Sequence, residues 1–238
     1  MTQESRGLQA QSGPDHPLRP VDAGTLILIR MGRSGPEVLM GQRHADLTFM
    51  PNRFVFPGGR VDRSDSAIRF PSNLRPSVRA QLTYRTRRRN VDALALAAIR
   101  ETFEETGLLV GRKGSNIQHT KTSGIWKYFT DQGITPSLED LEFVARAITP
   151  PGRVRRFDAR FFLSESEHFM AADRESSRFL GELRNVQWLQ FADALDLDLP
   201  YVTRRVLQHV QERYEAPKRQ QRAIFMRWQR NKEILDYL

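Results

Sequence analysis

The chain has 238 residues, a formal net charge of +9 at pH 7 and no cysteine. This length suffices for one domain with additions and a sizeable core, and the lack of cysteine excludes disulfides, thiolate zinc sites and cysteine nucleophiles. No apolar run approaches the roughly 20 residues of a membrane-spanning helix, so we expect no membrane partner.

Arginine dominates the basic residues. Its planar guanidinium suits phosphate recognition, so the charge favours anionic partners, with a merely solvated arginine-rich surface as the competing explanation. Residues 1–20 are polar, contain three prolines and lack the apolar core of a signal peptide. We therefore expect a disordered N-terminal tail over 1–20 and a cytoplasmic location.

The first half of the chain contains the signals of several strands. Residues 23–31 and 37–43 are apolar segments around a Gly- and Pro-rich turn, which predicts a β-hairpin. Residues 54–56 form a short apolar strand that ends at Pro57, followed by Gly58 and Gly59. Glycines at such a turn allow close approach of a phosphate, so both are candidate substrate-binding residues, although an ordinary turn would use them too.

Residues 77–89 can form a helix that ends in a basic cluster, Arg85 and 87–89. This cluster could reach substrate phosphates or nucleic acid. A solvated helix end explains the same residues and is the favoured alternative.

An alanine- and leucine-rich helix over 92–99 leads into the sequence RETFEETGL at 100–108. Glu101, Glu104 and Glu105 stand at i, i+3 and i+4, so their carboxylates share one helix face. Like charges at this spacing repel one another, but they suit a hard cation such as Mg²⁺ or Mn²⁺, which prefers oxygen ligands. Gly107 follows as the helix terminator.

The second half of the chain predicts further strands and helices. Strands are expected at 143–148, 157–163 and 186–189, and a short helix at 125–130. Helices are expected from Phe191 onward, with clear segments at 202–215 and 222–238.

Two groups of polar residues in this half are candidate site residues. Arg153, Arg155 and Arg156 follow a Pro-Gly turn and could contact an anionic part of a substrate, with ion pairs to Asp158 or solvent as the alternative. Glu182 precedes the strand at 186–189 and is the best general-base candidate outside the helix, with a surface acid equally compatible.

The segment at 100–108 resembles the Nudix box, G-x5-E-x7-R-E-U-x-E-E-x-G-U, in which U is a bulky aliphatic residue. The matching residues are Arg100, Glu101, Glu104, Glu105, Gly107 and Leu108. The glycine of the box is matched by Gly59, and the acid eight residues before the arginine falls on Asp92. This alignment implies that about 27 residues are inserted, over roughly 63–90.

The box together with FMPNRFVFPGGRVD and TPPGRVRRFDARFF resembles the Nudix subgroup of peroxisomal coenzyme A diphosphatases and their bacterial relatives. The resemblance implies an α/β fold: a Nudix α/β/α sandwich with a mixed sheet, a loop-helix-loop box, an inserted helical segment and C-terminal helices. It divides the chain into a tail at 1–20, a Nudix domain at 21–215 and a C-terminal helix at 216–238.

The resemblance implies hydrolysis of a diphosphate bond in a nucleoside diphosphate linked to another group, with Mg²⁺ or Mn²⁺. Glu104 and Glu105 are the expected metal ligands, Glu101 is a ligand or the general base, and Arg100 orients a glutamate. Coenzyme A or an acyl derivative is the leading substrate, and ADP-ribose, dinucleotides and nucleotide sugars are competitors. A non-catalytic nucleotide- or RNA-binding regulator is the alternative from another class, and a homodimer is left open.

Overall fold

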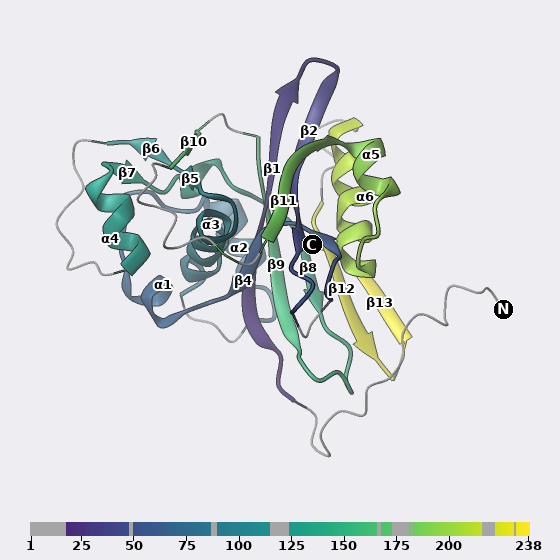
Figure 1. The fold of residues 1–238 in the computed structure, drawn as a ribbon. Coiled ribbons are helices and arrows are strands. Elements are labelled where there is room, and N and C mark those ends of the chain that lie inside the picture. The colour runs from purple at the N-terminus through teal and green to yellow at the C-terminus, as the bar shows by residue number, and fades with distance from the viewer. Residues whose placement is uncertain are drawn as a thin grey trace.

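The computed structural model describes residues 18–47, 50–86, 90–114, 124–165, 168–172, 181, 183–215, 222–230 and 232–238. A large mixed sheet forms its centre, and helices lie on both faces (Figure 1). The strands of this sheet are β1 (Val21–Gly32), β2 (Gly35–Arg43), β3 (Phe54–Val55), β4 (Gly58–Arg60), β8 (Glu142–Ile148), β9 (Phe157–Ser164), β11 (Leu183–Gln190), β12 (Ile224–Gln229) and β13 (Lys232–Tyr237). The α/β class predicted from the sequence is confirmed.

The strand order is β11-β2-β1-β9-β8-β12-β13, with β3 pairing with β2 and β4 with β1. β1 and β2 form the predicted hairpin, and β1 runs parallel to β9. β4 pairs antiparallel with the first half of β1, so that Gly59 lies opposite Gly24 and Gly58 opposite Thr25. This pairing places the two consecutive glycines at the centre of the sheet.

Two apolar cores lie on opposite faces of the sheet. One core packs beneath α3 (Asp92–Thr106), together with α2 (Pro76–Thr83) and α4 (Gly124–Asp131), and α1 (Arg63–Ala67) contacts α3. The other packs beneath α5 (Phe191–Asp196) and α6 (Tyr201–Glu215). Strand residues alternate between them: Leu26 and Leu28 face the α3 side, and Ile27 and Ile29 face α6.

Small elements complete the α3 side. They are β5 (Leu108–Val110), β6 (Arg112–Lys113), β7 (Ile134–Thr135), the 3₁₀ turn η2 (Leu138–Asp140) and β10 (Phe169–Ala171). β5 pairs with β10, and β6 pairs with β7. Among the described helices, none combines the length and apolar character that a membrane crossing would require.

Gly24 of β1 lets α3 approach the sheet. A Cβ at this position would lie 2.1 Å from the carbonyl oxygen of Leu94 and 2.9 Å from the backbone nitrogen of Ala98. No side chain can move aside to relieve such contacts, because both atoms belong to the helix backbone. The glycine therefore fixes the distance between the sheet and the helix that carries the glutamates.

We expect Gly24→Ala to lower the free energy of unfolding by about 1–3 kcal/mol, the usual cost of forcing extra volume into a packed core. Urea unfolding followed by circular dichroism measures the change. Gly181→Ala is the matched control, because a Cβ there meets no described atom within 4 Å. Equal stability losses in the two variants would contradict this account of Gly24.

The C-terminal segment corrects a prediction. The sequence predicts a helix over 216–238, but β12 and β13 form an antiparallel hairpin that extends the sheet beside β8. Ile224, Phe225 and Met226 are buried in this position, and Arg230 adopts a left-handed φ of 49° at the turn. The edge of β8 can satisfy the backbone groups of these residues, and this tertiary pairing overrides their local helical spacing.

Residues 1–17 of the predicted tail lie outside the described residues. Residues 87–89 of the basic cluster and Glu182 also lie outside them.

Candidate active site

α3 ends as its sequence predicts. Gly107 adopts the left-handed conformation with φ 72°, and its backbone N–H donates to the carbonyl oxygen of Phe103 at 2.8 Å. Thr102, which replaces the aliphatic residue of the motif, is fully buried and donates its hydroxyl to the carbonyl oxygen of Ala98. The last turn of α3, which carries Glu104 and Glu105, is therefore closed by a glycine cap.

Arg100 is the central residue of the site. Its Nη1 donates to Glu101 Oε1 at 2.9 Å and to Glu104 Oε2 at 2.6 Å. Its Nε and Nη2 donate to the two oxygens of Asp65 at 2.9 and 3.1 Å, and Nη2 also donates to the carbonyl oxygen of Arg60. A single buried guanidinium thus holds three carboxylates and ties α3 to the segment that follows β4.

Asp65 is a site residue that the sequence interpretation missed. It lies in α1, is fully buried, and accepts both the Arg100 fork and the backbone N–H of Asp62 at 2.8 Å. It stands six residues after Gly59, which is the spacing of glycine and acid in the Nudix box.

Asp92, which the count back from Arg100 selects, instead accepts two hydrogen bonds from Arg79 of α2, each of 2.8 Å. The insertion therefore lies between Asp65 and Arg100, whereas the sequence prediction placed it between Gly59 and Asp92. Counting six residues forward from Gly59 would have found Asp65, the buried partner of Arg100.

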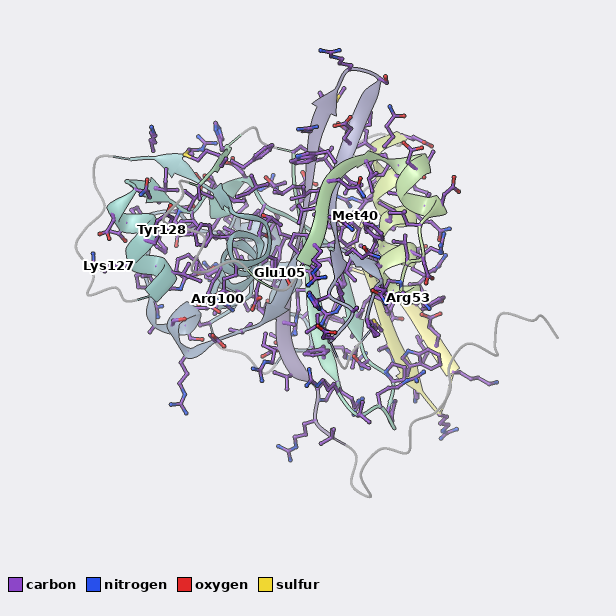
Figure 2. The ribbon with its side chains drawn as sticks, in the orientation of Figure 1. Met40, Arg53, Arg100, Glu105, Lys127 and Tyr128 are labelled. Carbon is purple, nitrogen blue, oxygen red and sulfur yellow. The ribbon has the colours of Figure 1, made fainter. Side chains whose placement is uncertain are left out.

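The two consecutive glycines lie against the carboxylates of Glu105 and Glu101. The backbone N–H of Gly58 donates to Glu105 Oε2 at 2.8 Å. A Cβ on Gly59 would lie 2.4 Å from the carboxyl carbon of Glu101, so only glycine leaves room for this carboxylate in its present place. Figure 2 shows Arg100 and Glu105 in the middle of the molecule, where α3 meets the large sheet.

Burial shifts the pKa values of this cluster. Desolvation alone would lower the pKa of Arg100, but the hydrogen bonds that Arg100 donates to Asp65 and the charges of Glu101, Asp65 and Glu104 outweigh it and raise the pKa above its ordinary value. Arg100 is therefore a permanent cation and cannot act as a base. Desolvation raises the pKa of Glu104 above its ordinary value, although the charge of Arg100 acts in the opposite direction.

The raised pKa of Glu104 gives a prediction for stability against pH. The folded state binds a proton at Glu104 more tightly than the unfolded state, so ionisation of this group removes stability as the pH rises through its raised pKa. In metal-free buffer, the free energy of unfolding of Glu104→Gln relative to wild type should increase between about pH 4 and about pH 7. Urea titrations at both pH values measure it, and a decrease would contradict the sign of the shift.

The carboxylates fit a hard cation by type and position. Three of them project from the same part of α3, and oxygen is the ligand that Mg²⁺ and Mn²⁺ prefer. Within the described residues, however, no group of three acidic or histidine side chains is gathered closely enough to hold an ion. Glu101 and Glu104 turn toward Arg100, while Glu105 turns toward Gly58. Glutamate side chains would have to rotate to share an ion.

The predicted substrate arginines lie in the turn between β8 and β9, which adjoins the start of β1. Arg156 donates to the carbonyl oxygens of Thr149 and Leu18 at 3.1 and 2.6 Å. Arg153 and Arg155 belong to the same turn, and Asp158 pairs with Arg146 and Arg160 rather than with them. Along β1, Val21 pairs with Phe157, and Gly24, three residues later, pairs with Gly59.

Known proteins resemble this chain in fold and in sequence. The crystal structure of a NUDIX hydrolase from Alicyclobacillus acidocaldarius superposes with a TM-score of 0.60 and 27% identity, covering 81% of this chain and 91% of that one. The chain has the fold of a Nudix hydrolase.

The putative nudix hydrolase 7 of Caenorhabditis elegans is 27% identical over 168 residues, which is 67% of this chain. The chain spans about half, 48%, of the length of that relative. No family model matches the chain. The chain is therefore similar to Nudix hydrolases in fold and in sequence.

Proposed function

We propose that this protein is a metal-dependent hydrolase that cleaves the diphosphate bond of a nucleoside diphosphate linked to another moiety. The observation that carries the proposal is one buried arginine that holds Glu101, Glu104 and Asp65, while Glu105 of the same helix accepts the backbone N–H of the first of two consecutive glycines. A surface acidic helix has no need for a buried guanidinium with five hydrogen bonds, whereas a site that must hold several like charges close together does.

The proposed metal is Mg²⁺ or Mn²⁺, with Glu104 and Glu105 as its ligands and Glu101 as a ligand or general base. Such an ion would supply charge neutralisation of the diphosphate and a lowered pKa of bound water. Arg100 would hold Glu101 and Glu104 in place, because its Nη1 donates a hydrogen bond to each carboxylate.

The glycines would let a substrate phosphate approach the backbone of β4 closely. Phosphoryl transfer depends mainly on positioning and electrostatics, so holding these groups in place before the substrate binds contributes to catalysis. Glu182 remains the alternative general base.

Coenzyme A or acyl-coenzyme A is the leading substrate. Support for it comes from the inserted box and the flanking segments that resemble the coenzyme A diphosphatase subgroup. ADP-ribose and dinucleotides are the alternatives, because the glutamates act on the diphosphate that all these compounds share.

A substrate panel tests the proposal. Coenzyme A, acetyl-coenzyme A, ADP-ribose, NADH, diadenosine polyphosphates and capped RNA are each incubated with the protein and Mg²⁺ or Mn²⁺, and products are separated by chromatography. We expect turnover of one class, dependent on the metal and abolished by a chelator. No turnover of any compound, combined with salt-sensitive RNA binding, would favour the regulator instead.

A further inference from the structure

β13 forms one edge of the large sheet, because it ends the strand order beside β12 (Figure 1). Its antiparallel pairing with β12 is regular over all six residues, without a bulge, and the strand contains no proline. Bulges and prolines are two of the devices that prevent an edge strand from pairing with a further strand. This edge has neither of them.

The backbone groups of alternate residues in β13 point away from β12. The N–H of Leu238 donates to the carbonyl oxygen of Ala223 at 2.8 Å, so the even-numbered residues of this segment face β12. The N–H and C=O groups of Glu233, Leu235 and Tyr237 therefore lie on the outer edge. No strand within the described part of the chain pairs with them.

The same edge exposes apolar side chains on the α6 face of the sheet. Leu235 and Tyr237 lie opposite residues of β12 that belong to the core beneath α6, yet they are 37% and 53% exposed. Tyr201, the first residue of α6, is 51% exposed, and its hydroxyl donates to Glu233 Oε2 at 2.6 Å. These three side chains are a surface that a further strand could cover.

The charges of β13 complement a second copy of the strand that runs in the opposite direction. Lys232 stands at one end and Asp236 near the other, both on the α3 face. Lys232 forms no ion pair among the described residues, and Asp236 pairs with Arg227 at 2.9 Å. Antiparallel pairing of two copies brings Lys232 of each toward Asp236 of the other, and this complementarity singles out the chain itself as the partner.

We propose that β13 is a dimerisation surface, on which a second copy of this chain pairs antiparallel about a two-fold axis at Leu235. In this register Leu235 opposes itself and Glu233 opposes Tyr237, so all three outward residues form hydrogen-bonded pairs. The carbonyl oxygen of Tyr237 accepts from Arg222 at 2.9 Å and can accept a second hydrogen bond.

The same register places Lys232 diagonal to Asp236 of the second copy, within reach of a long side chain. The large sheets of the two copies become one continuous sheet. The Arg100 cluster takes no part in this contact, so the inference stands apart from the proposed hydrolysis.

Sedimentation velocity of the full chain over a range of concentrations tests the surface. The mass of the wild type should approach twice that of a single chain as the concentration rises. Leu235→Lys sets two ammonium groups opposite each other and should weaken dimerisation by about tenfold or more. Val186→Lys is the matched control, because Val186 is also an exposed aliphatic residue, at 36%, on the opposite edge strand β11. It should dimerise as the wild type does.

The lack of cysteine in the chain allows a test of the register. Opposed residues of a hydrogen-bonded antiparallel pair have Cα atoms about 5.5 Å apart, within the range of a disulfide. With oxidised glutathione as the oxidant, Leu235→Cys should form an intermolecular disulfide. Tyr237→Cys lies on the same strand but opposes Glu233 of the second copy, so it should cross-link about tenfold more slowly or less.

Three results would overturn the proposal. One is the mass of a single chain at every concentration up to about 0.5 mM. Another is a dimer that Val186→Lys dissociates and Leu235→Lys does not. The third is an equal rate of cross-linking in the two cysteine variants. All substituted side chains are exposed, and thermal unfolding verifies that each variant keeps the fold.

Discussion

Replacing Glu105 by glutamine should reduce kcat/KM for the substrate found in the panel by about 100-fold or more, the scale on which single electrostatic groups act in active sites. Glu105 is 5% exposed and accepts the backbone N–H of Gly58. Glutamine has the same size, and its amide oxygen can accept that hydrogen bond. The variant therefore removes the negative charge while preserving the local packing.

Steady-state kinetics with Mg²⁺ and with Mn²⁺ measure the effect, and calorimetry measures metal affinity. The control is Glu37→Gln, because Glu37 pairs with Arg30 near the β1–β2 turn, remote from α3. Activity should be unchanged in the control. Full activity of Glu105→Gln with unaltered metal dependence would remove Glu105 from the site and with it the central part of the proposed function.

Replacing Asp65 by asparagine should lower the free energy of unfolding by about 3–5 kcal/mol, the usual cost of breaking a buried ion pair. The side chains of Asp65 and Arg100 are 0% and 6% exposed, so the guanidinium would remain out of water without the negative charge that faces its Nε and Nη2. The activity should fall by about 10–100-fold as well, as is usual when a residue that orients metal ligands is lost.

Asp92→Asn is the matched control for Asp65→Asn. Both aspartates accept two hydrogen bonds from one arginine, but the side chains of Asp92 and Arg79 are 23% and 40% exposed. Solvent screens this second pair, so its loss should cost less than about 1 kcal/mol. Equal stability losses for the two variants, measured by urea unfolding, would refute the central role of Asp65.

These two aspartates show what the sequence could establish and what it could not. α3, its terminating Gly107 and the pairing of Arg100 with neighbouring glutamates follow from local spacing, because all partners lie within one or two helical turns. Asp65 is 35 residues from Arg100, and local spacing carries no information about such a contact. Only the count from Gly59 identifies it.

The C-terminal hairpin could not be predicted from local spacing for a related reason. Residues 224–229 have a spacing compatible with either a helix or a strand, and the choice was made by the free edge of β8, which lies about 80 residues earlier in the chain. The strands of the central sheet were easier to predict, since their continuous apolar runs match burial on both faces.

The insertion also changes how this molecule must fold. In the uninterrupted motif the acid and the arginine are eight residues apart, whereas here the chain must close a loop of 35 residues before Asp65 and Arg100 can meet. Loop-closure entropy makes this step roughly 1 kcal/mol less favourable. The hydrogen bonds of Arg79, Ser72 and Arg75 can offset this cost only after α2 has packed in place. The ion pair between Asp65 and Arg100 should therefore form late in folding, after the inserted segment has packed. Substitution of Arg79 should then slow refolding more than substitution of any glutamate of α3.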